Sequence, residues 1–389
     1  MRLDPADVAL CVADYLPPAG GGPVAVSRAI EQTSLFAFPD FASLVDGLAH
    51  ERRDTVYSRG HNPTVRALEE KVARLERGEA CIAFGSGMGA VSGAMLGLLE
   101  AGDHVLLVNQ VYGPTRQLAA HLARFGVAHD VVLDLDPAAV RAALTPATRM
   151  VWLESPGTML FRVADIGEIA AVAHRHGALL AVDNSWATPL LQKPLELGAD
   201  LVVHSATKYL GGHSDLVAGA LVTTTGRAEQ IFERAYMLGG AVLAPFDAWL
   251  VLRGLRTLPV RLAQHEADAL QIAEFLLRHP AVAAVHHPAL AGPADLVERQ
   301  LRGFSGLLSF VLRRAEFATV AAVLDRLRRF RLGVSWGGVE SLALSPQRGP
   351  DPAPLAAQGI PAGLIRLSVG LEGAELLIED LAQALEAAS

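Results

Sequence analysis

The chain has 389 residues, of which 51% are hydrophobic and 19% are charged, and its formal net charge is −8. This length allows two or three domains with a large buried core. The acidic balance, without a long run of Lys or Arg, argues against a nucleic-acid-binding surface. Two cysteines are too few for a disulfide framework and lack metal-ligand spacing, which predicts a reducing, cytoplasmic environment. The start of the chain lacks the pattern of a secretory signal, and no apolar run reaches the ~18–20 residues of a membrane span.

Residues 1–57 predict an irregular arm, because they contain Pro17-Pro18 and Gly20-Gly21-Gly22. From about residue 64 to 225, helical periods alternate with short runs that are apolar throughout. This alternation predicts an α/β fold with a mostly parallel sheet covered on both faces. The predicted helices are 64–77, one that begins at Met88, 114–125, 137–144 and 166–176, and the predicted strands are 81–84, 104–108, 131–133, 150–153, 178–183 and 200–203.

The pattern changes near residue 250. A long helical stretch over 247–277 is interrupted near Pro259, and it is followed by predicted strands at 307–312, 332–336 and 364–369 and helices at 317–330 and 374–385. Fewer and more widely separated strands predict a smaller α+β domain. The predicted organisation is therefore an arm (1–57), a large α/β domain (58–250) and a C-terminal α+β domain (251–389).

The stretch "VVHSATKYLGGHSD" (202–215) places Lys208 just after an apolar strand. In a parallel sheet, ligands bind beyond the carboxyl ends of the strands. Partial burial there lowers the pKa of a lysine, which is how lysines become Schiff-base nucleophiles. A solvated surface lysine is the alternative. Ser205 and Thr207 precede Lys208 on the same turn and offer hydroxyl groups to a phosphate.

Asp183 closes the run "ALLAVD" and is predicted at the same sheet edge. By itself it fits a helix N-cap or a solvated carboxylate equally well. Together with Lys208 it matches the needs of pyridoxal phosphate, which requires a Schiff-base lysine and an acid beside its ring nitrogen.

A third strand-end motif, "GSGMGA" (85–90), lies between a predicted strand and a predicted helix. Backbone N–H groups at such a junction bind anions. The motif also fits the loose dinucleotide pattern G-x-G-x-x-A, but the next strand ends in Asn109-Gln110, where a ribose-binding acid is needed. We therefore predict a phosphate site.

Two further residues have alternatives that the sequence leaves open. Tyr112 follows the strand that ends at Asn109 and suits stacking on a flat cofactor, or is a half-buried loop tyrosine. Arg366 lies inside the apolar strand "LIRLSVGL" and fits either a structural ion pair or a grip on a substrate carboxylate. His204 and His213 lack a third ligand at any usual spacing, so no metal site is predicted.

The motifs around these residues resemble the Cys/Met-metabolism (transsulfuration) family of pyridoxal-phosphate enzymes, which have the aspartate-aminotransferase-like fold. "SATKYLGGHSD" around Lys208 and "AVDNSWATP" around Asp183 carry the resemblance, which extends from Tyr57 to the C-terminal helix. Several stretches, above all "VSWGGVESL" (334–342) with Trp336, are similar to the cystathionine β-lyase branch. "YSRGHNPT" (57–64) and "GSGMG" (85–89) instead look like the wider family, including its γ-synthases and γ-lyases.

The resemblance implies roles for individual residues. Lys208 would hold the cofactor as a Schiff base and later act as the base, Asp183 would pair with the ring nitrogen, and Tyr112 would stack on the ring. The phosphate would be held by Gly87, Met88, Ser205 and Thr207, with Tyr57 and Arg59 reaching it from a neighbouring subunit. The substrate would be bound by Arg366 and Ser335 at its α-carboxylate, with Trp336 and Tyr236 nearby. These roles imply at least a homodimer and favour a homotetramer.

The expected reaction is β-elimination of L-cystathionine, a small sulfur amino acid, to homocysteine, pyruvate and ammonia, with cystine and cysteine as further substrates. The alternatives on the same scaffold are cystathionine γ-synthase, cystathionine γ-lyase and methionine γ-lyase. A catalytically silent homologue is disfavoured, because Lys208, Asp183, Tyr112 and Arg366 are all present.

Overall fold

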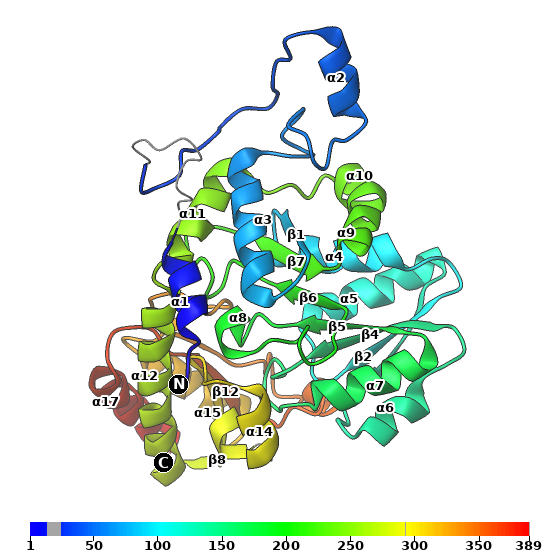
Figure 1. Ribbon diagram of the computed structural model, residues 1–389. Coiled ribbons are helices and arrows are strands. Elements are labelled where there is room, and N and C mark those ends of the chain that lie inside the picture. Colours follow the sequence, from blue (N-terminus) through cyan, green and yellow to red (C-terminus); the bar gives the residue numbers. More distant parts are fainter. Residues whose placement is uncertain (14–24, 292, 389) are drawn as a thin grey trace.

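The computed structural model describes residues 1–13, 25–291 and 293–388, and Pro17-Pro18 and Gly20-Gly21-Gly22 therefore lie outside the described residues. The described chain contains two β-sheets, one of seven strands and one of five (Figure 1). None of its described helices combines the length and apolar composition of a membrane span.

The seven-stranded sheet has the order β1-β7-β6-β5-β4-β2-β3. Strands β2 to β6 pair in parallel, whereas β7 is antiparallel to both β1 and β6. The prediction of a mostly parallel sheet is confirmed. The strands are β1 (Ala80–Phe84), β2 (His104–Val108), β3 (Ala128–Val132), β4 (Thr148–Glu154), β5 (Leu179–Asp183), β6 (Leu201–His204) and β7 (Gly219–Thr223).

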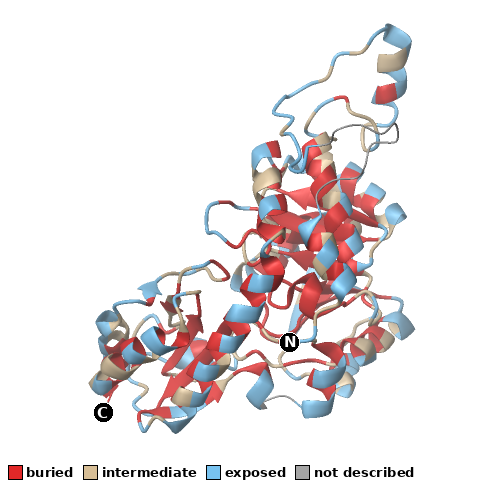
Figure 2. Cartoon of the chain, turned by 60° about the vertical axis from the view of Figure 1, so that its left-hand side comes forward, coloured by how far each residue is buried: buried red, intermediate tan, exposed pale blue. Residues whose placement is uncertain are grey.

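Helices cover this sheet on both faces, and its central strands are buried along most of their length, as their apolar runs require. The large side chains of Phe84 and Trp152 are both buried in one of these core layers. Figure 2 shows the buried strands inside an exposed outer layer. The helices are α3 (Pro63–Glu76), α4 (Gly87–Leu98), α5 (Gly113–Leu122), α6 (Pro137–Ala143), α7 (Ile166–His176), α8 (Thr188–Leu191), α9 (Thr225–Ile231), a π-helical turn (Phe232–Tyr236), α10 (Met237–Gly239) and α11 (Pro245–Leu255).

The five-stranded sheet has the order β10-β11-β12-β9-β8 and is mostly antiparallel. Its strands are β8 (Val282–His286), β9 (Leu307–Leu312), β10 (Arg331–Leu332), β11 (Leu342–Leu344) and β12 (Leu364–Ser368). Its helices are α12 (Leu258–Arg278), α13 (Pro288–Ala291), α14 (Ala294–Gln300), α15 (Phe317–Arg326), α16 (Ala353–Ala356) and α17 (Ala374–Leu385). A second, smaller α+β region is thus confirmed, while the limits 57 and 250 between domains stay predictions.

The predicted strand at 332–336 is wrong beyond its first residue, since β10 ends at Leu332. The carbonyl groups of Val334 and Ser335 instead accept hydrogen bonds from the Arg366 guanidinium, at 3.0 and 3.3 Å. A side chain from β12 therefore takes the acceptors that a neighbouring strand would have used.

The arm is also less irregular than predicted, because it contains α1 (Pro5–Val12) and α2 (Phe41–Leu48). Asp4 and Asp40 cap these helices, accepting from the N–H groups of Ala6 and Ser43. Helix α2 stands away from the rest of the chain at the end of the arm and is largely exposed (Figures 1 and 2).

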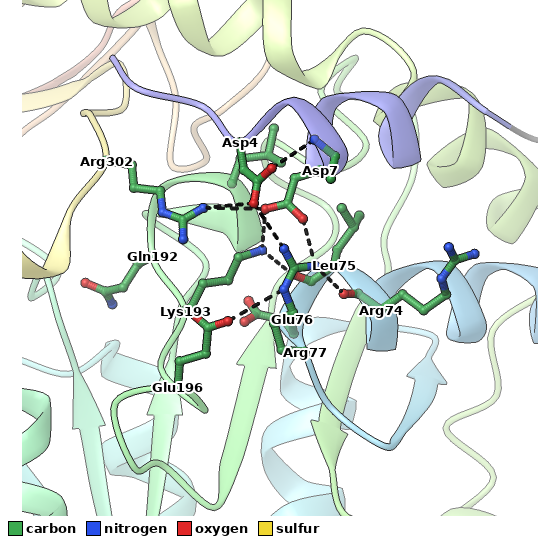
Figure 3. A network of polar contacts seen from close by, with 12 residues as sticks. Asp4, Asp7, Arg74, Leu75, Glu76, Arg77, Gln192, Lys193, Glu196 and Arg302 are labelled. Atoms are coloured by element: carbon green, nitrogen blue, oxygen red, sulfur yellow. Dashed lines mark hydrogen bonds and ion pairs between the residues drawn. The ribbon is translucent and has the colours of Figure 1, made fainter.

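Helix α1, in contrast, is held by a cluster of charges around the fully buried Asp7 (Figure 3). The Asp7 carboxylate lies 2.9 Å from Lys193 Nζ and 2.9 Å from the Arg77 guanidinium, and Arg302 lies 3.7 Å away. Lys193 is itself almost completely buried and also donates to the carbonyl of Leu75. A buried charge is tolerated only when it is paired in this way.

Candidate active site

A cavity lies beyond the carboxyl ends of β4, β5 and β6, where the parallel sheet predicts a ligand. It is lined by residues from five different loops and strand ends of the large sheet and by two residues of the smaller region. The lining residues are Ser86, Gly87, Met88, Val91, Tyr112, Glu154, Thr158, Phe161, Asp183, Ser185, Trp186, Val203, Ser205, Thr207, Lys208, Val217, Leu307 and Trp336.

Lys208 lies four residues after the end of β6, and it is one of the residues that line this cavity. Its Nζ donates to Ser335 Oγ at 2.7 Å and lies 5.2 Å from the centre of the Trp336 ring. Burial, together with the nearby Arg366 charge, lowers the pKa of Lys208 to about 8, although the Asp183 carboxylate opposes the shift. Roughly a tenth of this amine is therefore unprotonated at pH 7, in the form that a nucleophile or base requires.

Asp183 is the last residue of β5 and also lines the cavity. One oxygen of its carboxylate accepts the Ser185 N–H at 3.0 Å. Burial raises the pKa of this carboxyl, and the Ser185 hydrogen bonds and the charges of His204 and Lys208 oppose that rise. A buried carboxylate in this position is suited to pair with a cationic ring nitrogen.

The start of α4 lies against the turn that carries Ser205 and Thr207. Helix α4 begins at Gly87, and Ser86 caps it by accepting from the Gly89 N–H at 2.9 Å. A Cβ on Gly87 would lie 2.8 Å from the Cβ of Ser205, so only glycine allows this approach. The helix N-terminus and the two hydroxyl residues form a place for a phosphate.

Tyr112 caps α5 and lies at the mouth of the cavity, with 49% of its side chain exposed. Its backbone N–H donates to the Glu154 carboxylate at 2.7 Å. Burial and the neighbouring Asp183 raise the pKa of Glu154 well above the ordinary value. The sequence places Glu154 at a strand end just as it does Asp183, but it gave no reason to assign Glu154 a role in the site.

Arg366 lies on β12 and is 5% exposed. The structure records no ion pair for Arg366 with any carboxylate of the described residues, and its guanidinium binds the backbone of Val334 and Ser335. Burial lowers its pKa to about 10, where the group is still charged at neutral pH. The ion pair that was one of the two sequence interpretations is thus not found among the described residues.

Five predicted site residues do not line the cavity: Arg366 and Ser335, described above, and Tyr57, Arg59 and Tyr236. Tyr57 is 46% exposed in the arm, and the Arg59 guanidinium lies 5.7 Å from the centre of its ring. Tyr236 is buried and packs against Phe84 and Phe232, with ring centres 5.3 and 5.6 Å away. Burial raises the pKa of Tyr236 well above its ordinary value.

The cavity also contains apolar residues that the sequence did not single out, among them Phe161, Trp186 and Leu307. They come from loops and from the smaller sheet, and no local pattern distinguishes them from core residues. Trp186 lies within the motif that surrounds Asp183, which is the one signal that could have identified it.

The donor set fits pyridoxal phosphate: an amine for its aldehyde, a carboxylate for its ring nitrogen and a helix N-terminus with hydroxyls for its phosphate. These features define a Schiff-base enzyme. The family model described as "Cys/Met metabolism PLP-dependent enzyme" matches residues 21–386. The chain belongs to this family, and it is a pyridoxal-phosphate-dependent enzyme of sulfur amino-acid metabolism.

Individual relatives divide among three reactions. The chain is 42% identical to the L-methionine gamma-lyase of Pseudomonas putida (96% of each chain covered) and 43% identical to the cystathionine beta-lyase of Lactococcus lactis subsp. cremoris (93% and 94%). It is 41% identical to the cystathionine gamma-synthase of Mycobacterium leprae (90% and 91%). A solved cystathionine gamma synthase from Xanthomonas oryzae pv. oryzae, in complex with aminoacrylate and cysteine, superposes with a TM-score of 0.88 at 37% identity and 98% coverage of both chains.

Proposed function

We propose that the enzyme is a carbon–sulfur lyase that cleaves L-cystathionine by β-elimination, with cystine and cysteine as further substrates. The observation that carries this proposal is Trp336. Its indole ring lines the cavity beside the Lys208 amine, and the motif around it resembles the β-lyase branch. Comparison with the relatives does not separate the three reactions, since the identities lie between 41 and 43%.

Pyridoxal phosphate supplies an aldehyde for the amine and a protonated ring that withdraws electrons from the substrate Cα. Arg366 is the residue we assign to the substrate carboxylate, because its charge is buried and its guanidinium donates to neutral carbonyl groups. Lys208 removes the Cα proton, which the lowered pKa of its amine favours. The Cβ–S bond then breaks, the electron pair leaves with sulfur, and protonation gives homocysteine. Hydrolysis of the remaining three-carbon fragment yields pyruvate and ammonia.

Further roles are part of this proposal. Asp183 keeps the ring nitrogen protonated, Tyr112 stacks on the ring, and Gly87, Met88, Ser205 and Thr207 hold the phosphate. Ser335 steadies the Lys208 amine when it is free, as its 2.7 Å contact indicates. Tyr57 and Arg59 lie away from the cavity of their own chain, which supports their action in a neighbouring subunit's site. A cytoplasmic homo-oligomer stays a prediction.

A γ-elimination or γ-replacement is the second candidate, and the high structural similarity to the Xanthomonas γ-synthase favours it. Product analysis separates the two. After incubation with L-cystathionine, β-cleavage gives pyruvate and homocysteine, whereas γ-cleavage gives 2-oxobutyrate and cysteine. The Lys208→Ala variant is the control and should form neither product. If 2-oxobutyrate dominates with the wild-type enzyme, the β-lyase proposal is wrong.

A further inference from the structure

Glu154 is an acidic residue of the cavity for which the proposed reaction has no role. It is the last residue of β4 and lies opposite Asp183 of β5 in the register of the parallel strands. Two carboxyl groups therefore lie side by side at one sheet edge, and Glu154 is only 9% exposed. Such an arrangement is costly, because each buried carboxylate disfavours ionisation of the other.

The contacts of the Glu154 side chain reach two other residues of the cavity. Its Oε2 accepts the backbone N–H of Tyr112 at 2.7 Å, and its carboxylate also accepts from the Thr158 hydroxyl. Its own backbone carbonyl accepts from the Asn109 side chain at 2.8 Å. Glu154 thus connects the end of β4 to the loop after β2 and to the loop that follows β4 itself.

The loop after β2 is the one that places the Tyr112 ring. Because about half of Tyr112 is exposed, neighbouring side chains hold its ring only in part, and the position of its backbone matters for where the ring lies. The contact with Glu154 holds that backbone at residue 112. This hydrogen bond needs an acceptor oxygen within reach of the Tyr112 N–H, and the full length of the Glu154 side chain provides it.

We propose that Glu154 is a positioning residue, which holds Tyr112 and Thr158 at the cavity so that the Tyr112 ring lies against the bound cofactor. This role depends on the reach of the Glu154 side chain to the Tyr112 N–H. It rests on the family's cofactor and not on the choice of sulfur substrate, so it holds for a β-lyase and a γ-lyase alike.

Two variants of Glu154 distinguish the length of its side chain from its negative charge. Glu154→Asp keeps the carboxylate but is one methylene too short for the Tyr112 N–H, whereas Glu154→Gln keeps the length and an acceptor oxygen but loses the charge. The readouts are the visible circular dichroism of the cofactor in the purified holoenzyme and the rate of cofactor loss on dialysis. We expect E154D to lose cofactor about tenfold faster with an altered visible spectrum, and E154Q to stay within about twofold of wild type.

Glu69 provides a matched control. It is also an acid whose pKa is raised by burial, and it accepts one backbone N–H, that of Ala83 at 2.9 Å, but it does not line the cavity. The Glu69→Asp variant should lower the melting temperature and leave both cofactor readouts at wild-type values. A purely structural role of Glu154 would make E154D behave like E69D, which would overturn the proposal.

Two other outcomes decide the matter. If E154Q loses cofactor as fast as E154D, length is not the property that matters and the proposal is wrong.

If E154D does not fold, a second variant provides the test. Thr158→Val removes the hydroxyl that donates to the Glu154 carboxylate, and it should change the visible spectrum of the cofactor. A wild-type spectrum in T158V would then overturn the proposal. Both readouts are independent of substrate, so a failure to cleave cystathionine leaves this test intact.

Discussion

Replacing Gly87 with alanine tests whether the start of α4 and Ser205 together hold the phosphate. The new Cβ would lie 2.8 Å from the Cβ, 2.9 Å from the Oγ and 3.1 Å from the Cα of Ser205. Carbon atoms in contact prefer about 3.5–4.0 Å, so the helix start and the turn must separate by roughly 0.7 Å or more. Rotation of the Ser205 side chain cannot relieve this, because its Cβ and Cα do not move with χ1.

The stability effect of this substitution is small, and the binding effect is larger. Overpacking costs about 1–3 kcal/mol, and replacing a helical glycine returns about 0.5–1 kcal/mol, so the net loss is roughly 0–2.5 kcal/mol. Hydrogen bonds to a charged phosphate contribute about 1.5–3 kcal/mol each, so misplacing one of them should speed cofactor loss by about tenfold or more.

The assay follows the visible absorbance of the holoenzyme, expected at about 420 nm, during dialysis, together with the melting temperature. Gly226→Ala is the matched control, because Gly226 lies in α9 and a Cβ there would have no atom within 4 Å. We expect G226A to retain cofactor like wild type and to gain up to about 0.5–1 kcal/mol of stability. If G87A retains its cofactor as well as G226A does, the assignment of this junction to the phosphate is refuted.

Two further predictions concern acid stability and subunit contacts. Burial lowers the pKa values of His265 and His287 to about 4, so the folded protein keeps them neutral while the unfolded chain takes up protons below about 6.5. The free energy of unfolding should therefore fall as the pH drops from about 6.5 to about 4, by up to about 3 kcal/mol per histidine. Urea unfolding across this range should show that the free energy of unfolding of His265→Gln falls less steeply than that of the wild type. Arg59→Ala and Lys208→Ala subunits, each inactive alone, should regain about a quarter of wild-type activity when refolded together, because half of the dimers would contain one intact site of two. No regain would show that Arg59 does not act across subunits.

The parallel sheet could be predicted because its central strands are largely buried on both faces and so appear as apolar runs. The strand β7, in contrast, was missed, since Gly219–Thr223 follows a glycine-rich loop directly and has no helix before it. The two helices of the arm were missed although their capping residues Asp4 and Asp40 are visible in the sequence. The prolines and glycines at 17–22 led to the prediction of an irregular arm despite these caps.

The location of Lys208 and Asp183 at one cavity follows from the sheet, because strand ends meet at the same edge. Glu154 ends a strand in the same way, but its sequence gives no sign that it faces the loop of Tyr112 rather than solvent. That contact depends on the order of the strands in the sheet, in which β2 and β4 are neighbours although β3 lies between them in the chain. No local sequence pattern identifies residues that are brought together by the order of the strands.

The buried charges around Asp7 have a consequence for the order in which the chain is completed during synthesis. Helix α1 is made before any other described helix, yet its partners are Arg77, Lys193 and Arg302. Domains generally begin to fold while the ribosome is still adding residues. Helix α1 cannot reach its final place until residue 302 has emerged, so the first helix to be made is among the last to be fixed.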